Sequence, residues 1–302
     1  MSAMPPWRSA SPHSPERTAT TFGGDLKRLW RGSEDVRRTI KSTAVVIHAL
    51  ILREALTRYG RRSAGFLWAI VQPVTQLVAL LLIFAYLRHR TPAAGESLTI
   101  FLMTGIMPVF LVRGGLRQGA GAIASNRGLM IYRKVGAFEV ITARQVLELT
   151  ISLCVVLCVM VFMKVFHGLA FHEWVDRGFS LLQALAALAC LAYGLSYLSA
   201  QIGRMFDQWR DFSGILGRIL FFTSGVWFTL DSLPPAIRKW AVLNPLAHVI
   251  EWIRDAALPT FSSLHVDHLY PFQFGLTCLF IGLFIDWLHQ ISGYDLVAGR
   301  RR

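Results

Sequence analysis

Charge is scarce in this sequence, and one phosphate-binding motif is missing from it altogether. Of the 302 residues, 16% are charged and 54% are apolar, a balance that water-soluble domains seldom reach. The sequence contains no Gly-x-x-x-x-Gly-Lys-Ser/Thr segment, and not even a Gly-Lys dipeptide. Lipid is therefore the expected solvent, and any ATP hydrolysis that drives the protein is expected on another chain.

Cysteine and buried acid are also scarce. The four cysteines form no Cys-x-x-Cys pair and have no neighbouring histidine, so we expect neither a metal site nor a redox site. Glu148 is the one good candidate for a carboxylate deep in an apolar run. An ion-coupled carrier needs several such carboxylates, and a membrane-embedded sugar or lipid transferase needs convergent acids or histidines at the membrane surface. Both classes are therefore disfavoured.

The first 35 residues lack the apolar core of a secretion signal and are rich in Ser, Pro, Thr and Arg. This composition predicts a disordered cytoplasmic tail over residues 1–35. A transmembrane domain is expected over residues 36–302.

The chain does contain apolar runs close to the length of about 20 residues that crosses the hydrocarbon core as a helix. Five runs are clear, and a sixth is short but continues past Arg113 and Arg117, whose long side chains can snorkel to the headgroups. The predicted spans are residues 66–87, 98–123, 140–166, 179–202, 212–230 and 272–288.

Residues 36–62 carry the pattern of a helix that lies on a membrane surface. Apolar residues recur there at spacings of four and three, and basic residues surround them. The apolar face consists of Val45, Ala49, Leu52, Leu56 and Tyr59. The pattern predicts an interfacial amphipathic helix; a soluble helix packed on a partner is the alternative.

Residues 231–258 are too interrupted to cross a membrane. Pro245 removes a backbone donor and disfavours helix at Asn244, so two short helices should meet there and form a re-entrant hairpin. The predicted fold class is an all-α membrane protein with six transmembrane helices, an N-terminal interfacial amphipathic helix and a re-entrant helical hairpin before the last span.

The basic residues indicate an orientation. Most of the 31 Lys and Arg fall before the first span, after the last one, or in the segments that lie on the same side. This asymmetry predicts that both termini are cytoplasmic. The same distribution, between apolar runs rather than on a soluble face, argues against nucleic acid as a partner.

A cytoplasmic segment between the second and third spans mixes bulky apolar and basic residues. A solvated loop has no need of that mixture, so we expect a short helix that docks into a groove on a partner; burial against the membrane surface is the alternative. The expected ATPase-coupling residues are Asn126, Arg127, Leu129, Met130, Tyr132 and Arg133.

Positive charge and aromatic rings also gather in or beside the spans. An unpaired cation at membrane depth is costly unless it faces water, an anionic headgroup or an acidic cargo, whereas aromatic rings are also ordinary packing residues. The candidates for a substrate channel are Arg58, Arg61, Arg62, Trp68, Arg113, Arg117, Arg218, Phe222 and Trp227. Arg144 and Glu148 are four positions apart on one helix, which predicts a structural ion pair or, alternatively, a role in transport.

Several segments together resemble a known family. They are Tyr59-Gly-Arg-Arg-Ser-Ala-Gly-Phe-Leu-Trp68 followed by Gln72-Pro73, then Arg88-His-Arg-Thr91, then Asn126-Arg-Gly-Leu-Met-Ile-Tyr-Arg133 with Arg144 and Glu148 beyond it, and Asn244-Pro-Leu-Ala-His248 with Glu251 and Arg254. In order and spacing they are similar to the capsular-polysaccharide export permeases of the KpsM type, within the type 2 ABC exporters.

The resemblance implies a homodimer in the bacterial inner membrane, each copy docked through residues 126–133 on a cytoplasmic ATPase that holds ATP and magnesium. It implies that a lipid-linked acidic polysaccharide leaves through a channel between the copies, with periplasmic and outer-membrane partners completing the route. Membrane lipids are further expected partners. An exporter of O-antigen or teichoic-acid type polymer, or of a small hydrophobic molecule, is the alternative within the same fold.

Overall fold

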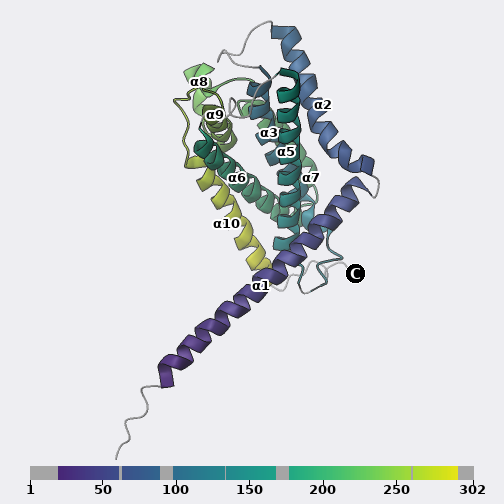
Figure 1. The fold of residues 1–302 in the computed structure, drawn as a ribbon, viewed down its shortest axis with the longest axis vertical. Helices are drawn as coiled ribbons and strands as arrows, with labels where there is room; N and C mark the ends of the chain where they lie inside the picture. The colour runs from purple at the N-terminus through teal and green to yellow at the C-terminus, as the bar shows by residue number, and fades with distance from the viewer. Residues whose placement is uncertain are drawn as a thin grey trace, which may run out of the picture. The chain divides into compact units, whose positions relative to one another are not determined.

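A computed structural model describes residues 20–60, 63–88, 98–132, 134–167, 177–259 and 261–291, and within these ranges the regular structure is entirely helical (Figure 1). The helices are α1 (Thr20–Tyr59), α2 (Ser63–Arg88), α3 (Leu98–Ala120), α4 (Ala122–Ser125), α5 (Ala137–His167), α6 (Gly178–Met205), α7 (Trp209–Thr223), a 3-10 turn η2 (Leu230–Ser232), α8 (Pro235–Ala241), α9 (Pro245–Ala257) and α10 (Tyr270–Ile291). The expected all-α class is confirmed.

Four of the described helices are long and apolar enough to cross a membrane. They are Leu98–Ala120, Ala137–Phe162, Gly178–Met205 and Tyr270–Ile291. The chain divides into two compact units, Met1–Val45 and Val46–Arg302, and the packing described below is that of the second unit.

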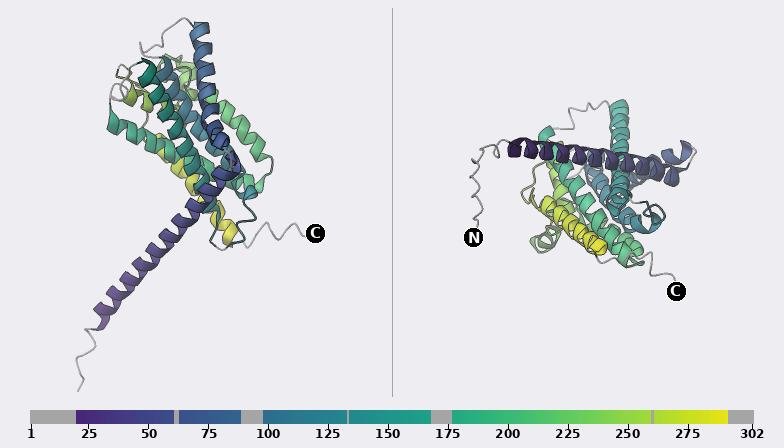
Figure 2. Two further views of the ribbon diagram at one scale, coloured as in Figure 1. Left: turned by 45° about the vertical axis from the view of Figure 1, so that its right-hand side comes forward. Right: turned by 90° about the horizontal axis from the view of Figure 1, so that it is seen from below.

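Helix α6 holds this second unit together, because its most extensive contacts are with α10 and α3 (Figures 1 and 2). Two glycines let the backbones of α6 and α10 meet. A Cβ on Gly194 would lie 2.0 Å from the carbonyl oxygen of Gly275, so no larger residue fits there. Small residues at such crossings are the usual basis of helix packing in membranes, where apolar surface alone drives little association.

The disordered tail predicted over residues 1–35 is wrong in its second half. Helix α1 begins at Thr20 and continues to Tyr59. The last proline before it is Pro15, and residues 20–59 contain no proline, the residue that removes a helical hydrogen bond. Residues 1–19 lie outside the described residues.

The interfacial helix ends where it was expected to, near residue 60, at a glycine with φ of +72°. Its predicted apolar face is largely uncovered, since Val45, Leu52 and Leu56 are all exposed, whereas the opposite face buries Leu50 and Glu54 against the bundle. A helix with one apolar face left open and one face fixed to a bundle is suited to a membrane surface.

The fifth predicted span is too long. Helix α7 has 15 residues and ends at Thr223, not at residue 230. Gly225 follows with φ of +79°, a left-handed conformation that a residue with a Cβ adopts only with strain, and the chain leaves the helical path there. Sequence hydropathy did not predict the stop because residues 224–230 remain mostly apolar.

The irregular backbone after α7 is held by a buried arginine. Arg254 of α9 is fully buried, and its guanidinium donates to the carbonyl oxygens of Gly225 at 2.8 Å, Val226 at 3.1 Å and Phe228 at 3.2 Å. It also lies 3.8 Å from the ring centroid of Phe101. Non-helical backbone inside a membrane bundle needs such partners, because no water reaches its carbonyls.

The break at Asn244–Pro245 is confirmed. Helix α8 ends at Ala241, and the Asn244 side chain caps α9 by accepting a hydrogen bond of 3.0 Å from the backbone N–H of Leu246. Nearly every residue of α9 is buried.

Candidate functional site

Polar side chains of the second unit gather around one cavity of about 720 Å³. Its walls come from α1, the end of α3, α4, α5 and the part of α7 up to Arg218. The charged residues that line it are Glu54, Arg58, Arg117, Arg144, Arg210, Asp211 and Arg218. Four residues predicted from the sequence therefore meet at one place: Arg58, Arg117, Arg144 and Arg218.

The ion pair predicted between Arg144 and Glu148 is replaced by a four-residue network. Arg144 pairs with Glu54 at 3.0 Å, and Glu148 pairs with Arg58 at 2.6 Å. Arg58 also contacts Glu54 at 3.0 Å, which closes the chain of charges. The direct pair is a correction, because spacing along α5 could not reveal that α1 supplies a carboxylate and a cation from the side.

The network fixes both of its cations. Burial by itself lowers the pKa of the Arg58 guanidinium, but the carboxylates of Glu148 and Glu54 outweigh that effect and raise the pKa above its ordinary value. Arg144 donates in addition to the carbonyl oxygen of Gln118 and to the hydroxyl of Ser125, at 2.9 and 2.6 Å. These two arginines are therefore charged and largely neutralised within the protein.

A second, smaller cavity of about 200 Å³ contains the next group of predicted residues. Trp68, Arg113 and Arg117 line it together with Tyr59 and Glu148. Arg117 and Gln118 line both cavities, so the two spaces share a wall on α3. Gly114 makes room for Glu148 here, because a Cβ at that position would lie 2.8 Å from its carboxylate oxygen.

The two cavities carry excess positive charge. Six arginines (Arg58, Arg113, Arg117, Arg144, Arg210 and Arg218) and three acids (Glu54, Glu148 and Asp211) line them. Among the described residues, the ion pairs use the two glutamates on Arg58 and Arg144, and none of them involves Arg113, Arg117 or Arg218. These three cations are available to an anion that enters from outside the chain.

The remaining channel candidates lie elsewhere. Phe222 is 65% exposed on α7, and Trp227 packs edge-on against Phe221 with their ring centroids 5.1 Å apart. Neither lines the two cavities. Arg61 and Arg62 lie outside the described residues. Sequence reasoning missed Glu54 and Arg210, although Glu54 precedes Arg58 by four positions, a spacing that indicates a helical ion pair.

The segment predicted to couple to an ATPase is not a helix. After α4 ends at Ser125, the chain continues in successive turns, with the N–H groups of Leu129 and Met130 both donating to the carbonyl of Asn126. Gly128 in its middle disfavours a helix. Arg133 lies outside the described residues.

The side chains of this segment divide into two groups. Leu129 and Met130 pack against the cluster formed by α1, α4, α5 and α6, whereas Ile131 and Tyr132 are 78% and 66% exposed. Arg127 is half-buried. Asn126 is buried, and its carbonyl oxygen accepts a hydrogen bond of 2.6 Å from Arg53 of α1. The exposed tip is therefore Ile131 and Tyr132, whereas Asn126, Leu129 and Met130 pack within the chain's own fold.

Comparisons with known proteins agree with this architecture. The pattern of the ABC-2 type transporter family matches residues 45–258. The chain is 35% identical over 239 residues to the polysialic acid transport protein KpsM of Escherichia coli, covering 79% of this chain and 91% of that protein.

Two further relatives extend the comparison. The capsule polysaccharide export inner-membrane protein CtrC of Neisseria meningitidis serogroup B is 30% identical over 69% of this chain and 77% of its own length. The O-antigen export system permease protein RfbA of Myxococcus xanthus is 24% identical over 74% of this chain and 81% of its own length. The resemblance seen in the sequence is confirmed, and the chain belongs to the ABC-2 type transporter family of membrane proteins.

Proposed function

We propose that this chain is the inner-membrane permease of an ATP-driven exporter of capsular polysaccharide, and that its cargo is a lipid-linked acidic polymer. The observation that carries the acidic cargo is the group of three arginines, Arg113, Arg117 and Arg218, which line the cavities outside every ion pair of the described residues. Cations at membrane depth are costly unless an anion or water meets them. A polymer with a carboxylate or phosphate on each repeat meets that need.

A second copy of the chain completes the channel. Helix α7 exposes Ile215 and Phe222 on the same side as Arg218, so one face combines bulky apolar residues with a charge. Lipid solvates such a face poorly, whereas a water-filled space between two copies accommodates it. This face supports the homodimer.

Energy enters from a separate ATPase that binds ATP and magnesium. The exposed pair Ile131 and Tyr132, with Arg127 and Lys134 close by in sequence, is the surface of this chain best suited to a groove on that partner. Partners in the periplasm and the outer membrane then carry the polymer onward. The chain itself is a transport subunit and performs no catalysis.

Removal of the available cations tests the acidic cargo. Arg117→Gln combined with Arg218→Gln should lower the capsule exported to the cell surface by at least about tenfold, since two charge contacts of roughly 1 kcal/mol each are lost. Lys239→Gln, an exposed cation on α8, is the matched control and should export normally. Normal export by a stably inserted double variant would reject an acidic cargo at this site.

The competing cargo is an O-antigen type polymer, favoured by the likeness to RfbA. An uncharged O-antigen would make export insensitive to the two arginine substitutions. Export of charged and uncharged polymers by the same double variant therefore separates the two proposals.

A further inference from the structure

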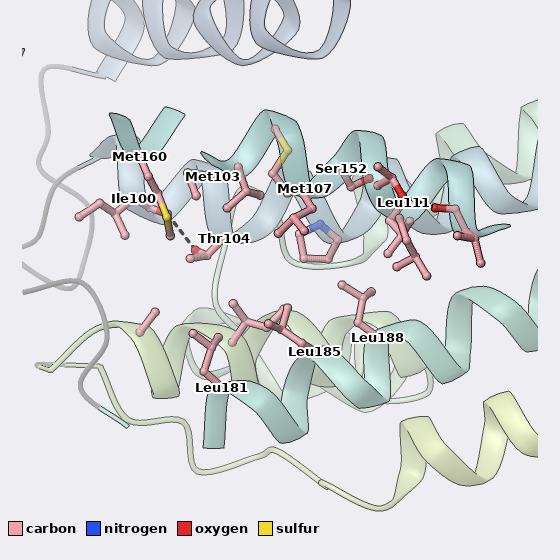
Figure 3. Close-up of a pocket in the computed structure, with 18 residues that line it drawn as sticks. Ile100, Met103, Thr104, Met107, Leu111, Ser152, Met160, Leu181, Leu185 and Leu188 are labelled. Carbon is pink, nitrogen blue, oxygen red and sulfur yellow. Dashed lines mark hydrogen bonds between the residues drawn. The ribbon is translucent and has the colours of Figure 1, made fainter. Parts of the chain in front are cut away.

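A second pocket lies away from the basic cavities, and its lining is almost entirely apolar (Figure 3). It has a volume of about 430 Å³ and is walled by α3 and α5 on one side and by α6 on the other, with two residues from α9. Figure 3 shows Met160, Ile100 and Leu181 at one end and Leu111 and Leu188 toward the other. We call this pocket the groove.

We propose that the groove binds one acyl chain of an anionic membrane phospholipid whose phosphate lies beside Lys164 and Arg177. This site is distinct from the basic cavities, and it depends only on the membrane placement of the proposed function, not on the polymer.

The dimensions of the groove fit one acyl chain. Its lining on α3 runs from Ile100 to Leu111, which is about 17 Å of helix at 1.5 Å per residue. One leaflet of the hydrocarbon core is about 15 Å thick. A cavity of about 150 Å³ accommodates benzene, so the groove has room for roughly three times as many carbon atoms.

Both threonines that line the groove are hydrogen-bonded within their own helices. Thr104 donates to the carbonyl oxygens of Ile100 and Phe101 at 2.9 and 3.0 Å, and Thr150 donates to that of Val146 at 2.8 Å. Leu153 of α5 and Leu185 of α6 line it and are exposed, which opens the groove sideways toward lipid. An acyl chain can therefore enter from the membrane.

Two basic residues at one end of the groove indicate that the lipid headgroup is anionic. Lys164 lies one turn beyond the lining residue Met160 on α5, and Arg177 lies one turn before the lining residue Leu181 on α6. Both are exposed at the same end, and Arg177 remains 54% exposed although it pairs with Asp255 at 3.0 Å. Basic residues at the end of an apolar groove between helices can pair with the phosphate of an anionic phospholipid whose acyl chain lies in the groove.

The test is native mass spectrometry of the full chain, purified with its ATPase, after incubation with phosphatidylglycerol or phosphatidylcholine of the same acyl length. The wild-type protein should retain phosphatidylglycerol in preference to phosphatidylcholine. Leu185→Trp fills the groove from α6 and should lower retention of both lipids about tenfold, because several methylenes of the chain are displaced.

Matched variants separate the groove from the general surface. Leu182→Trp adds the same ring to an exposed position of α6 that does not line the groove, and it should retain lipid normally. Leu153→Trp fills the groove from α5 and should reproduce the loss, even if Leu185→Trp folds poorly. Lys164→Gln should abolish the preference for phosphatidylglycerol and leave chain binding intact.

Three results would overturn the proposal. One is equal lipid retention by the wild type and both groove-filling variants. Another is an unchanged phosphatidylglycerol preference in Lys164→Gln, which removes the headgroup contact. The third is lipid retention only by protein that was purified from cells that make the polymer, which assigns the groove to the cargo's own lipid. Capsule export is measured in parallel, so failure of the groove is distinguished from failure of the transport function.

Discussion

At the scale of single residues, the buried charges of the network around Glu54 each have several partners. The side chains of Arg58, Glu54 and Arg144 are 14%, 11% and 10% exposed, and each has more than one polar contact. Removal of one partner from such a group costs more than the pair contributes, because the other charge is left without compensation.

Glu54→Gln should destabilise the folded protein by about 2 kcal/mol, because Arg144 loses its carboxylate and keeps only its contacts with Gln118 and Ser125. The change is measured as the midpoint of thermal unfolding in detergent. Asp207→Asn, at an exposed acid between α6 and α7, is the control and should unfold like the wild type. An unchanged midpoint for Glu54→Gln would show that the network does not hold α1 on the bundle.

Arg254→Met should prevent the protein from accumulating in the membrane. It leaves the carbonyls of Gly225, Val226 and Phe228 without their donor, at roughly 1 to 3 kcal/mol each. Membrane levels are measured by immunoblot, and Arg254→Lys should recover part of the loss because a single ammonium can still serve one or two carbonyls. Wild-type levels of Arg254→Met would contradict the described role of this guanidinium.

At the scale of elements, hydropathy predicted where the long helices lie but not which interactions end them or hold them together. The helices α3, α5, α6 and α10 agree closely with the predicted spans, since an apolar run of that length has few stable alternatives to a helix that crosses the membrane. The end of α7 depends on the positive φ of Gly225 and on an arginine from a later helix. The partners of Arg144 and Glu148 likewise come from α1, and such long-range pairs leave no periodic pattern in the sequence.

Neighbouring residues of the proposed ATPase-coupling segment, residues 126–133, should respond differently to substitution. Ile131→Asp should release the ATPase during purification while the unfolding midpoint stays unchanged, because Ile131 is exposed and contributes roughly 1.5 to 3 kcal/mol only when a partner buries it. Leu129→Asp should lower both the recovery of the ATPase and the unfolding midpoint, because Leu129 also packs on the chain's own cluster.

The measurements are ATPase recovery and capsule export, with Ile131→Val as the conservative control. If Ile131→Asp recovers the ATPase and exports normally, contact with the ATPase shifts to the turn between α6 and α7, where Met205 and Phe206 are also exposed.

At the scale of the whole molecule, the prediction concerns which side of the membrane each end of the bundle faces. The test uses a variant without the four native cysteines. In intact cells, Leu264→Cys should react with a membrane-impermeant thiol reagent, whereas Ile131→Cys should react only after the cells are permeabilised. Both positions are highly exposed in this chain, so in cells that lack the ATPase, which is proposed to cover Ile131, access to the reagent is limited by the membrane alone. Labelling of Ile131→Cys in intact cells would reverse the orientation inferred from the basic residues.

The burial of Arg254 also has a consequence for the order in which the chain assembles. The residues whose carbonyls receive its guanidinium, namely Phe101, Gly225, Val226 and Phe228, all precede it in the sequence. During synthesis they leave the ribosome before α9 does, so the arginine enters the bundle with its acceptors already made. An arginine placed early in the chain, with acceptors that follow it, would have to wait in lipid without them.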